Sequence, residues 1–178
     1  MQCNTNVMKK LLLFIASAMV LVSCNLGKGE NVETYSYGFS KAEVKFDGFT
    51  TPGEDQVGYW TVILKLEDQV EAYLELVSDA DESKGLPAQT YKCAGYTSTK
   101  DVKYTFIPGD IDADAVPVHT HIRFLSDDGD SVQYGLFTDG TITVTKESNT
   151  YTIDCALKSY NTNVILYYKG EPGKEDEK

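Results

Sequence analysis

Hydrophobic and polar residues alternate along most of this chain, and the alternation predicts β-strands. The clearest pair covers residues 59–66 and 70–78. Trp60 and Leu64 share one face of the first strand. Ala72, Leu74 and Leu76 share one face of the second. A period of two with one polar face is typical of an antiparallel sheet that covers a core on one side.

The alternation changes phase once near the start of the pattern. Tyr37 and Phe39 occupy odd positions, whereas Ala42 and Val44 occupy even ones. A shift by one residue moves side chains to the other face of a strand, so a bulge or a break between two short strands is expected near Ser40.

The remaining pattern adds several short strands separated by turn residues. Asp-Gly pairs at 128–129 and 139–140 are strong turn signals because they tolerate positive φ. No helical periodicity follows residue 24. We therefore expect an all-β chain, an antiparallel β-sandwich of about nine or ten short strands, with a calycin-like β-barrel as the alternative. The further strands are expected at 86–91, 102–106, 118–125, 131–137, 142–144, 151–157 and 164–168.

The beginning of the chain has the layout of an export signal. Lys9 and Lys10 follow Met8 and precede an apolar run over residues 11–22. The run is shorter than the roughly 20 residues that a membrane-spanning helix needs, but it suits a signal peptide. It ends in Leu-Val-Ser before Cys24, which resembles the lipobox of bacterial lipoproteins. The resemblance implies removal of residues 1–23, with a start at Met8, and diacylation of Cys24, which anchors the protein to a membrane.

This layout divides the chain into four expected parts. Residues 1–23 are the signal peptide, 24–33 a lipidated tether, 34–170 a single β domain and 171–178 a disordered charged tail. In lipoproteins an aspartate after the lipidated cysteine often retains the protein at the inner membrane. Asn25 stands there instead, so the resemblance implies the outer membrane and leaves its periplasmic or surface face open.

The charge of the chain excludes one class of partner. Lysine and arginine number 16 against 27 aspartates and glutamates, and removal of Lys9 and Lys10 with the signal leaves a formal charge of −13. A surface this acidic repels phosphate backbones, so nucleic acid is not expected as a partner. Tyrosine, with 12 residues, suits a half-buried sheet surface.

Three segments of the expected domain also resemble a group of proteins. The turn at 86–91, the hairpin strand at 140–146 and the strand at 151–154 are similar to parts of small lipoproteins of gut bacteria. Those are β-sandwich or calycin-like domains, often of unassigned function and often found with glycan-uptake systems. The resemblance implies a fold and a cellular setting rather than an activity.

Two groups of residues are candidates for binding a metal ion. His119 and His121 stand two apart on an expected strand and would project from one solvent-facing side, a spacing that can bind a transition metal. Asp110, Asp112 and Asp114 alternate in a loop, as calcium ligands often do, but the glycine and glutamate of an EF-hand are missing. No cofactor is expected, and calcium stays an open alternative to a hydrated acidic loop.

The cysteines and aromatic residues offer two further candidates. Cys93 and Cys155 are each in phase with inward-facing residues, and either a disulfide or two buried thiols would fit. Tyr59 and Tyr73 fall on the polar faces of neighbouring strands, so an exposed aromatic pair that binds a ligand is one hypothesis. Cross-strand tyrosines that merely stabilise the sheet are the other.

Together these features favour a binding protein over an enzyme. The chain has no nucleophile elbow and no phosphate-binding glycine loop. We expect a non-catalytic, membrane-anchored binding or accessory domain on the outer membrane that engages glycan or a protein of an uptake complex. The alternatives are a calycin-like carrier of a small apolar ligand and a structural or adhesive surface protein.

Overall fold

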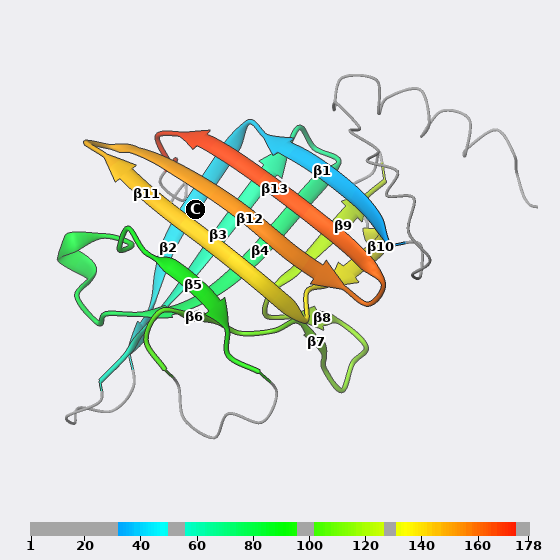
Figure 1. The fold of residues 1–178 in the computed structure, drawn as a ribbon, viewed down its shortest axis with the longest axis horizontal. Helices are drawn as coiled ribbons and strands as arrows, with labels where there is room; N and C mark the ends of the chain where they lie inside the picture. Colours follow the sequence, from blue (N-terminus) through cyan, green and yellow to red (C-terminus); the bar gives the residue numbers. More distant parts are fainter. Residues whose placement is uncertain (1–31, 50–55, 96–101, 127–130, 174–178) are drawn as a thin grey trace, which may run out of the picture.

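The computed structural model describes residues 32–49, 56–95, 102–126 and 131–173, and these residues form strands joined by turns (Figure 1). The all-β class is confirmed. The strands are β1 (Glu33–Phe39), β2 (Lys41–Phe49), β3 (Gly58–Leu66), β4 (Val70–Ser78), β5 (Thr90–Cys93), β6 (Thr105–Phe106), β7 (Asp110–Ile111), β8 (Pro117–Val118), β9 (His121–Leu125), β10 (Ser131–Leu136), β11 (Asp139–Glu147), β12 (Thr150–Ser159) and β13 (Thr162–Gly170). The 3-10 turn η2 (Glu82–Lys84) precedes β5.

Eleven of these strands belong to one sheet that folds over itself. Its order is β1-β13-β12-β11-β5-β6-β4-β3-β2, and β9 joins β4 on one side and β10 on the other. In Figure 1 the strands β1, β13, β12 and β11, with β5 beside them, form a front layer, and β2, β3, β4, β9 and β10 cross behind them as a rear layer. The sheet is not closed, since β1 and β2 are its two ends. The sandwich is confirmed and the closed barrel does not describe this chain.

Two pairings depart from the expected antiparallel pattern. β1 runs parallel to β13, and β5 runs parallel to β6. The strands β1 and β13 come from opposite ends of the domain, so no tight turn forces them to run in opposite directions. The strands β7 and β8 have two residues each, too few to show an alternation, and they were not expected as separate strands.

The clearest predicted pair forms as expected. β3 and β4 pair in antiparallel register over nine residues, with Val62 opposite Leu74. Alternate residues of both strands point into the core, and Trp60, Leu64 and Leu74 are at most 3% exposed. Glu67, in the turn between the strands, has a φ of 51°, a conformation suited to a tight hairpin.

The expected break near Ser40 is the point where the chain passes between the layers. β1 ends at Phe39 in the front layer and β2 begins at Lys41 in the rear layer. The Ser40 amide donates a hydrogen bond to the Lys65 carbonyl oxygen at 3.1 Å. Phe39 and Ala42 are both buried, so the change of phase lets side chains from both strands reach the same core.

Side chains fill the space between the two layers. Each fully buried side chain contributes roughly 1.5–3 kcal/mol to folding. The largest of these side chains, less than 2% exposed, are Tyr91, Phe106, Phe137, Leu64, Leu74, Leu76, Leu86, Ile142, Ile153, Leu157 and Leu166. The calycin-like carrier of a small apolar ligand stays a prediction.

The two ends of the chain fall partly outside the description. The signal peptide, Cys24 and most of the tether lie in residues 1–31, and residues 174–178 of the expected tail also lie outside the described residues. Within residues 171–173, the Gly173 amide donates to the Ala42 carbonyl oxygen at 2.8 Å, and Gly173 forms a β-bridge with Glu43. These first residues of the expected tail therefore lie along β2.

Candidate binding face

The outer surface of the front layer carries exposed apolar side chains at its centre. On β13, Val164, Leu166 and Tyr168 point into the core, so Ile165 and Tyr167 project outward. Ile165 is 45% exposed and Tyr167 is 44% exposed. We call this surface the open face, and define it by Gly38, Ile165, Tyr167, Asp154, Ala156, Thr143 and Thr90.

Strand register aligns four of these residues in one row across the sheet. Tyr167 on β13 lies opposite Asp154 on β12, Asp154 lies opposite Thr143 on β11, and Thr143 lies opposite Thr90 on β5. Gly38 lies beside Tyr167 on β1, and a Cβ added there would meet no atom within 4 Å. One side of the tyrosine is therefore bordered by open space rather than by a neighbouring side chain.

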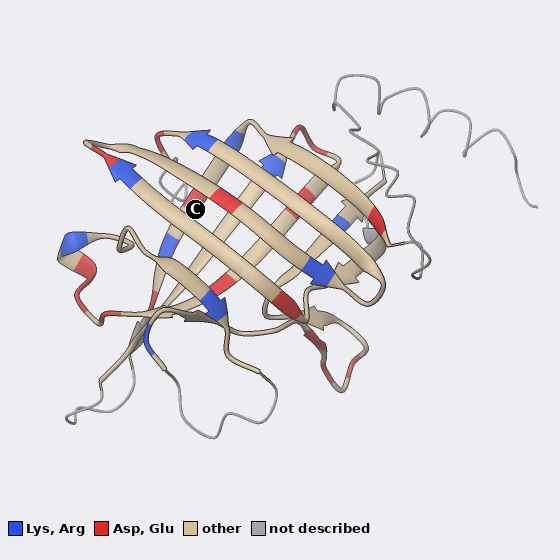
Figure 2. Cartoon of the chain, in the orientation of Figure 1, with Lys and Arg blue, Asp and Glu red and all other residues tan. Residues whose placement is uncertain are grey.

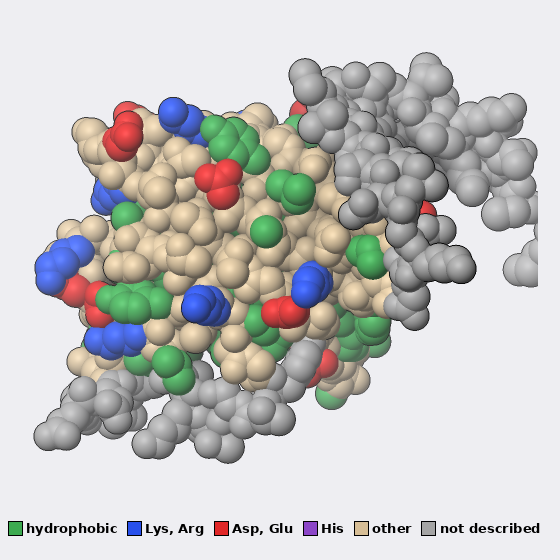
Figure 3. All heavy atoms as spheres, in the orientation of Figure 1, with side chains coloured by type: hydrophobic (Ala, Val, Ile, Leu, Met, Phe, Trp, Pro, Cys, Tyr) green, Lys and Arg blue, Asp and Glu red, His purple; other side chains and the backbone are tan. Residues whose placement is uncertain are grey.

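Asp154 is the charged member of this row. Its carboxylate makes no hydrogen bond or ion pair with any residue of the described ranges. The two threonine hydroxyls of the row contact each other, with 3.2 Å between Thr90 Oγ1 and Thr143 Oγ1. Figure 2 shows the charged positions of β11 and β13 near the strand ends, with one acidic position in the middle of β12. In Figure 3, backbone and uncharged polar side chains, both drawn tan, cover much of the described part of this side, with scattered hydrophobic and charged side chains among them.

The outer surface of the rear layer has the opposite character, because its charged groups contact one another. Arg123 donates from Nε to Glu71 Oε2 at 2.7 Å and makes a second, shorter contact from Nη2. Lys65 Nζ lies 2.6 Å from Glu43 Oε1 and 4.0 Å from Glu71 Oε1. We call this surface the paired face, and define it by Glu43, Lys65, Glu71, Tyr73, Glu75, His119, His121 and Arg123.

Tyr73 lies inside this network and not in an exposed aromatic pair, so the pairing hypothesis for Tyr59 and Tyr73 is wrong. Tyr59 is opposite Val77 and Tyr73 is opposite Ile63, a separation of four positions, or about 14 Å along the strands. The Tyr73 ring is half-buried and covered on its faces, as the next contacts show.

His121 and Arg123 hold the Tyr73 side chain in place. The His121 ring stacks on the Tyr73 ring with 4.9 Å between centroids and 6° between planes. The Arg123 guanidinium carbon lies 4.8 Å from the ring centroid, and its Nη2 donates to the Tyr73 hydroxyl at 2.7 Å. Burial, with the Glu71 charge second, raises the pKa of Tyr73. The ring faces that could stack on a ligand are thus already occupied.

The two histidines do not share a solvent-facing side, so that prediction is wrong. His119 has a φ of 60° and interrupts the expected strand at 118–125, so β9 begins only at His121. His119 Nδ1 lies 2.7 Å from Glu75 Oε2. His121 is 6% exposed and its Nδ1 donates to the His119 carbonyl oxygen at 2.9 Å. Burial lowers the pKa of His121, and the neighbouring Arg123 charge adds to that effect.

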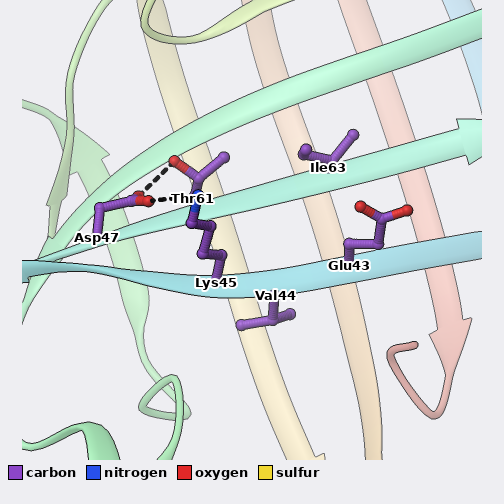
Figure 4. Close-up of a pocket in the computed structure, with 6 residues that line it drawn as sticks. All are labelled: Glu43, Val44, Lys45, Asp47, Thr61 and Ile63. Atoms are coloured by element: carbon purple, nitrogen blue, oxygen red, sulfur yellow. Dashed lines mark hydrogen bonds and ion pairs between the residues drawn. The ribbon is translucent and has the colours of Figure 1, made fainter. Parts of the chain in front are cut away.

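A shallow groove lies on the outer side of β2 and β3, next to the paired face. Figure 4 shows Glu43, Lys45, Thr61 and Ile63 on one side of these two strands. The Thr61 hydroxyl donates to Asp47 at 2.6 Å. The volume of the groove is about 110 Å³, below the roughly 300–1,000 Å³ of most small-molecule sites. Its polar groups are largely occupied by one another, and the groove is not our candidate site.

The aspartates of the expected calcium loop support the backbone of that loop. Asp112 Oδ1 accepts hydrogen bonds from the Asp114 and Val116 amides at 3.0 and 2.8 Å. Asp110 Oδ1 accepts from the Ile111 amide at 2.8 Å. Such contacts are common for aspartate in turns. Within the described ranges, no group of three or more His, Cys, Asp and Glu side chains is arranged to hold a metal ion. Calcium binding stays an open alternative to a hydrated acidic loop.

Cys93 and Cys155 are free thiols, so the disulfide alternative is wrong. Cys155 pairs with Ile142 of β11, and Ile142 pairs with Tyr91 of β5, two residues before Cys93. Two strand spacings amount to about 10 Å, beyond the roughly 7 Å between Cα atoms that a disulfide can bridge. Cys93 Sγ donates to the Thr138 carbonyl oxygen at 3.3 Å, and burial raises the pKa of both thiols.

Comparisons with protein-family models, with curated proteins and with solved structures find no match for this chain. Across the described ranges, no helix has the length and apolar character needed to cross a bilayer. The lipidation site at Cys24 lies outside these ranges and stays a prediction.

No sequence-based prediction identified the open face, although the strand pattern contains one signal for it. In the last expected strand, at 164–168, Val164, Leu166 and Tyr168 occupy alternate positions, and a period of two places Ile165 and Tyr167 on the opposite side. Two large apolar residues on an outward side are unusual enough to notice. That Asp154 stands beside Tyr167 depends on the register of β12 against β13, which the sequence alone does not give.

Proposed function

We propose that this protein is a lipid-anchored, non-catalytic binding domain of the outer membrane that binds carbohydrate through its open face. The proposal combines the export and lipidation signal ending at Cys24 with the surface around Tyr167. The tether would hold the domain near the membrane, and the open face would engage the ligand.

The observation that carries the proposal is the exposed Tyr167 ring beside the Asp154 carboxylate, which has no hydrogen-bond or ion-pair partner among the described residues. Sugars present apolar C–H faces and hydroxyl edges, so they suit an aromatic ring together with hydrogen-bonding groups. Tyr167 and Ile165 provide apolar surface, and Asp154 lies next to the ring as an acceptor. Thr143 and Thr90 extend the polar edge of the same row.

The same row argues against glycoside hydrolysis. Hydrolysis of a glycosidic bond ordinarily needs two carboxyl groups that flank the bond, one acting as an acid. The row from Tyr167 to Thr90 contains the single carboxylate of Asp154. Binding without reaction is the role that this set of side chains supports best.

A glycan array with the full chain in detergent tests the proposal. We expect binding that Tyr167→Ala reduces by at least about tenfold. Tyr134→Ala is the matched control, since Tyr134 is a strand tyrosine of similar exposure, 48%, on β10 of the rear layer. Absence of binding to every glycan would remove the proposal and leave a protein partner as the occupant. If Tyr134→Ala lost binding and Tyr167→Ala kept it, the binding site would lie on the rear layer and not on the open face.

The anchor has a separate test. Cells that express the protein and are fed a labelled fatty acid should incorporate the label into the wild-type chain, and Cys24→Ser should abolish it. Label retained in the Cys24→Ser variant would contradict the lipoprotein assignment and leave the carbohydrate-binding part of the proposal standing.

A further inference from the structure

We propose that the end of the sandwich at which β1 begins rests on the phospholipid headgroups of the membrane that holds the anchor. We call this end the tether end, and define it by Val32, Tyr35 and Tyr160. The inference rests on the lipidation of Cys24 proposed above and adds a second contact with the membrane, which gives the domain an orientation.

Tyr160 is the most exposed large hydrophobic side chain of the described residues, at 83%. It lies at the tip of the turn between β12 and β13, since Ser159 pairs with Thr162. Its φ of 51° is a backbone conformation that glycine and asparagine adopt more readily than an aromatic residue. The fold therefore does not require a tyrosine at this tip, and its ring is available to a partner.

Val32 and Tyr35 lie at the same end of the molecule. β1 runs parallel to β13 and begins beside the turn, with Glu33 opposite Thr162. Figure 1 shows the start of β1 and the β12–β13 turn together at one end of the front layer. Val32 is 50% exposed and Tyr35 is 42% exposed. The tether end thus presents two aromatic side chains and one aliphatic side chain to solvent.

The turn that carries Tyr160 is uncharged. Residues 159–163 read Ser-Tyr-Asn-Thr-Asn, whereas at the other end of β12 the chain carries Lys146 and Glu147. Moving a charge out of water is costly, so the uncharged turn approaches a headgroup layer with the smaller penalty. Tyrosine suits that layer, because its ring is apolar and its hydroxyl can stay hydrated.

The acidic groups of the chain favour zwitterionic over anionic headgroups. Glu33 is exposed at the tether end, and its Oε2 accepts a hydrogen bond from the Tyr35 hydroxyl at 2.6 Å. Anionic lipids attract lysine and arginine clusters and repel carboxylates. The partner that fits the tether end is therefore a phospholipid surface without net charge.

The position of the anchor brings this end to the bilayer. Residues 25–31 alone separate Cys24 from Val32, so Val32 cannot lie more than about 28 Å from the lipidated cysteine. A restraint this short keeps the tether end at a high local concentration beside the headgroups, and weak contacts then suffice to orient the domain. The strands β1 and β13 would lead away from the membrane, and the open face would be turned to the side, where a glycan can reach it.

Fluorescence quenching by brominated lipid tests the inference. The mature, lipidated chain with Tyr160→Trp is placed in phosphatidylcholine vesicles with and without bromine on the upper acyl chain. Trp60, the single natural tryptophan, is 3% exposed, and the unsubstituted chain gives its background. Tyr167→Trp on the open face is the matched control. We expect quenching of Tyr160→Trp to be at least about threefold stronger than that of Tyr167→Trp.

Val32→Trp is a second reporter at the tether end and should also be quenched more strongly than the control. If both reporters were quenched no more than Tyr167→Trp in vesicles that carry the protein, the inference would be overturned and the anchor would stand. Stronger quenching of Tyr167→Trp would overturn it too, since the open face would then lie on the membrane. If the unsubstituted chain failed to float with the vesicles, the proposed anchor would fail and this inference with it.

Discussion

The two outer faces of the sandwich arise from the same alternating pattern but differ in what their polar groups contact. On the paired face, Glu71 receives Arg123 and lies near Lys65, and Tyr73 is covered by His121. On the open face, Asp154 has no partner in the described part of the chain, and Tyr167 is 44% exposed. One face satisfies its charged groups internally, and the other carries a carboxylate that has no such partner in the described residues.

The contrast between the two faces shows that an outward position on a strand does not by itself make a side chain available for binding. Tyr73 and Tyr167 both alternate with core residues and both project outward. Only the cross-strand neighbours separate them, since Tyr73 meets Ile63 and His121 whereas Tyr167 meets Gly38 and Asp154. The paired face should therefore contribute to stability and the open face to binding.

The largest expected contrast comes from one carboxylate on each face. The Glu71 side chain is 13% exposed, and Glu71→Gln should lower the free energy of unfolding by about 2 kcal/mol because Arg123 loses its charged partner. Asp154→Asn should change it by no more than about 0.5 kcal/mol. Urea unfolding of both variants measures the difference. Equal losses would show that the two faces do not differ as we infer.

The two tyrosines provide a smaller contrast. Tyr73→Ala should cost about 1–2 kcal/mol of unfolding free energy, since it removes stacking with His121 and the hydrogen bond from Arg123. Tyr167→Ala should cost about 0.5 kcal/mol. Both variants remove the same atoms from a strand position, so each is the control for the other. A larger loss for Tyr167 would mean that its ring packs against the protein.

The smallest expected contrast is a pH dependence carried by His121. Burial holds its pKa below the ordinary value in the folded state. The unfolded state therefore binds the proton more readily than the folded state. The free energy of unfolding falls as the pH drops from about 6.5, the ordinary histidine pKa, toward the lowered pKa of the folded state. His121→Gln should weaken this dependence between neutral and mildly acidic pH in urea unfolding. If the pH dependence of the unfolding free energy were the same in His121→Gln as in the wild type, other groups would carry it. Asp154→Asn on the open face is the control variant.

Much of the fold could be predicted from the sequence because burial imposes a period of two. The strands β3 and β4 and the break at Ser40 followed from that period. The break in the strand before His121 could not be predicted, because nothing in the local pattern marks the positive φ of His119. The parallel pairing of β1 with β13 joins residues far apart in the chain, which local periodicity does not encode.

The sequence by itself determined the all-β class, the inward faces of β3 and β4 and the acidic charge, and it predicts a signal that ends at Cys24. These depend on residue type and on spacing between near neighbours. Only the tertiary structure decided that Cys93 and Cys155 stand two strands apart, that Tyr73 is covered, and that Asp154 lies beside Tyr167. The physical reason is strand register, which is set by packing of the whole core and brings together residues that no local pattern connects.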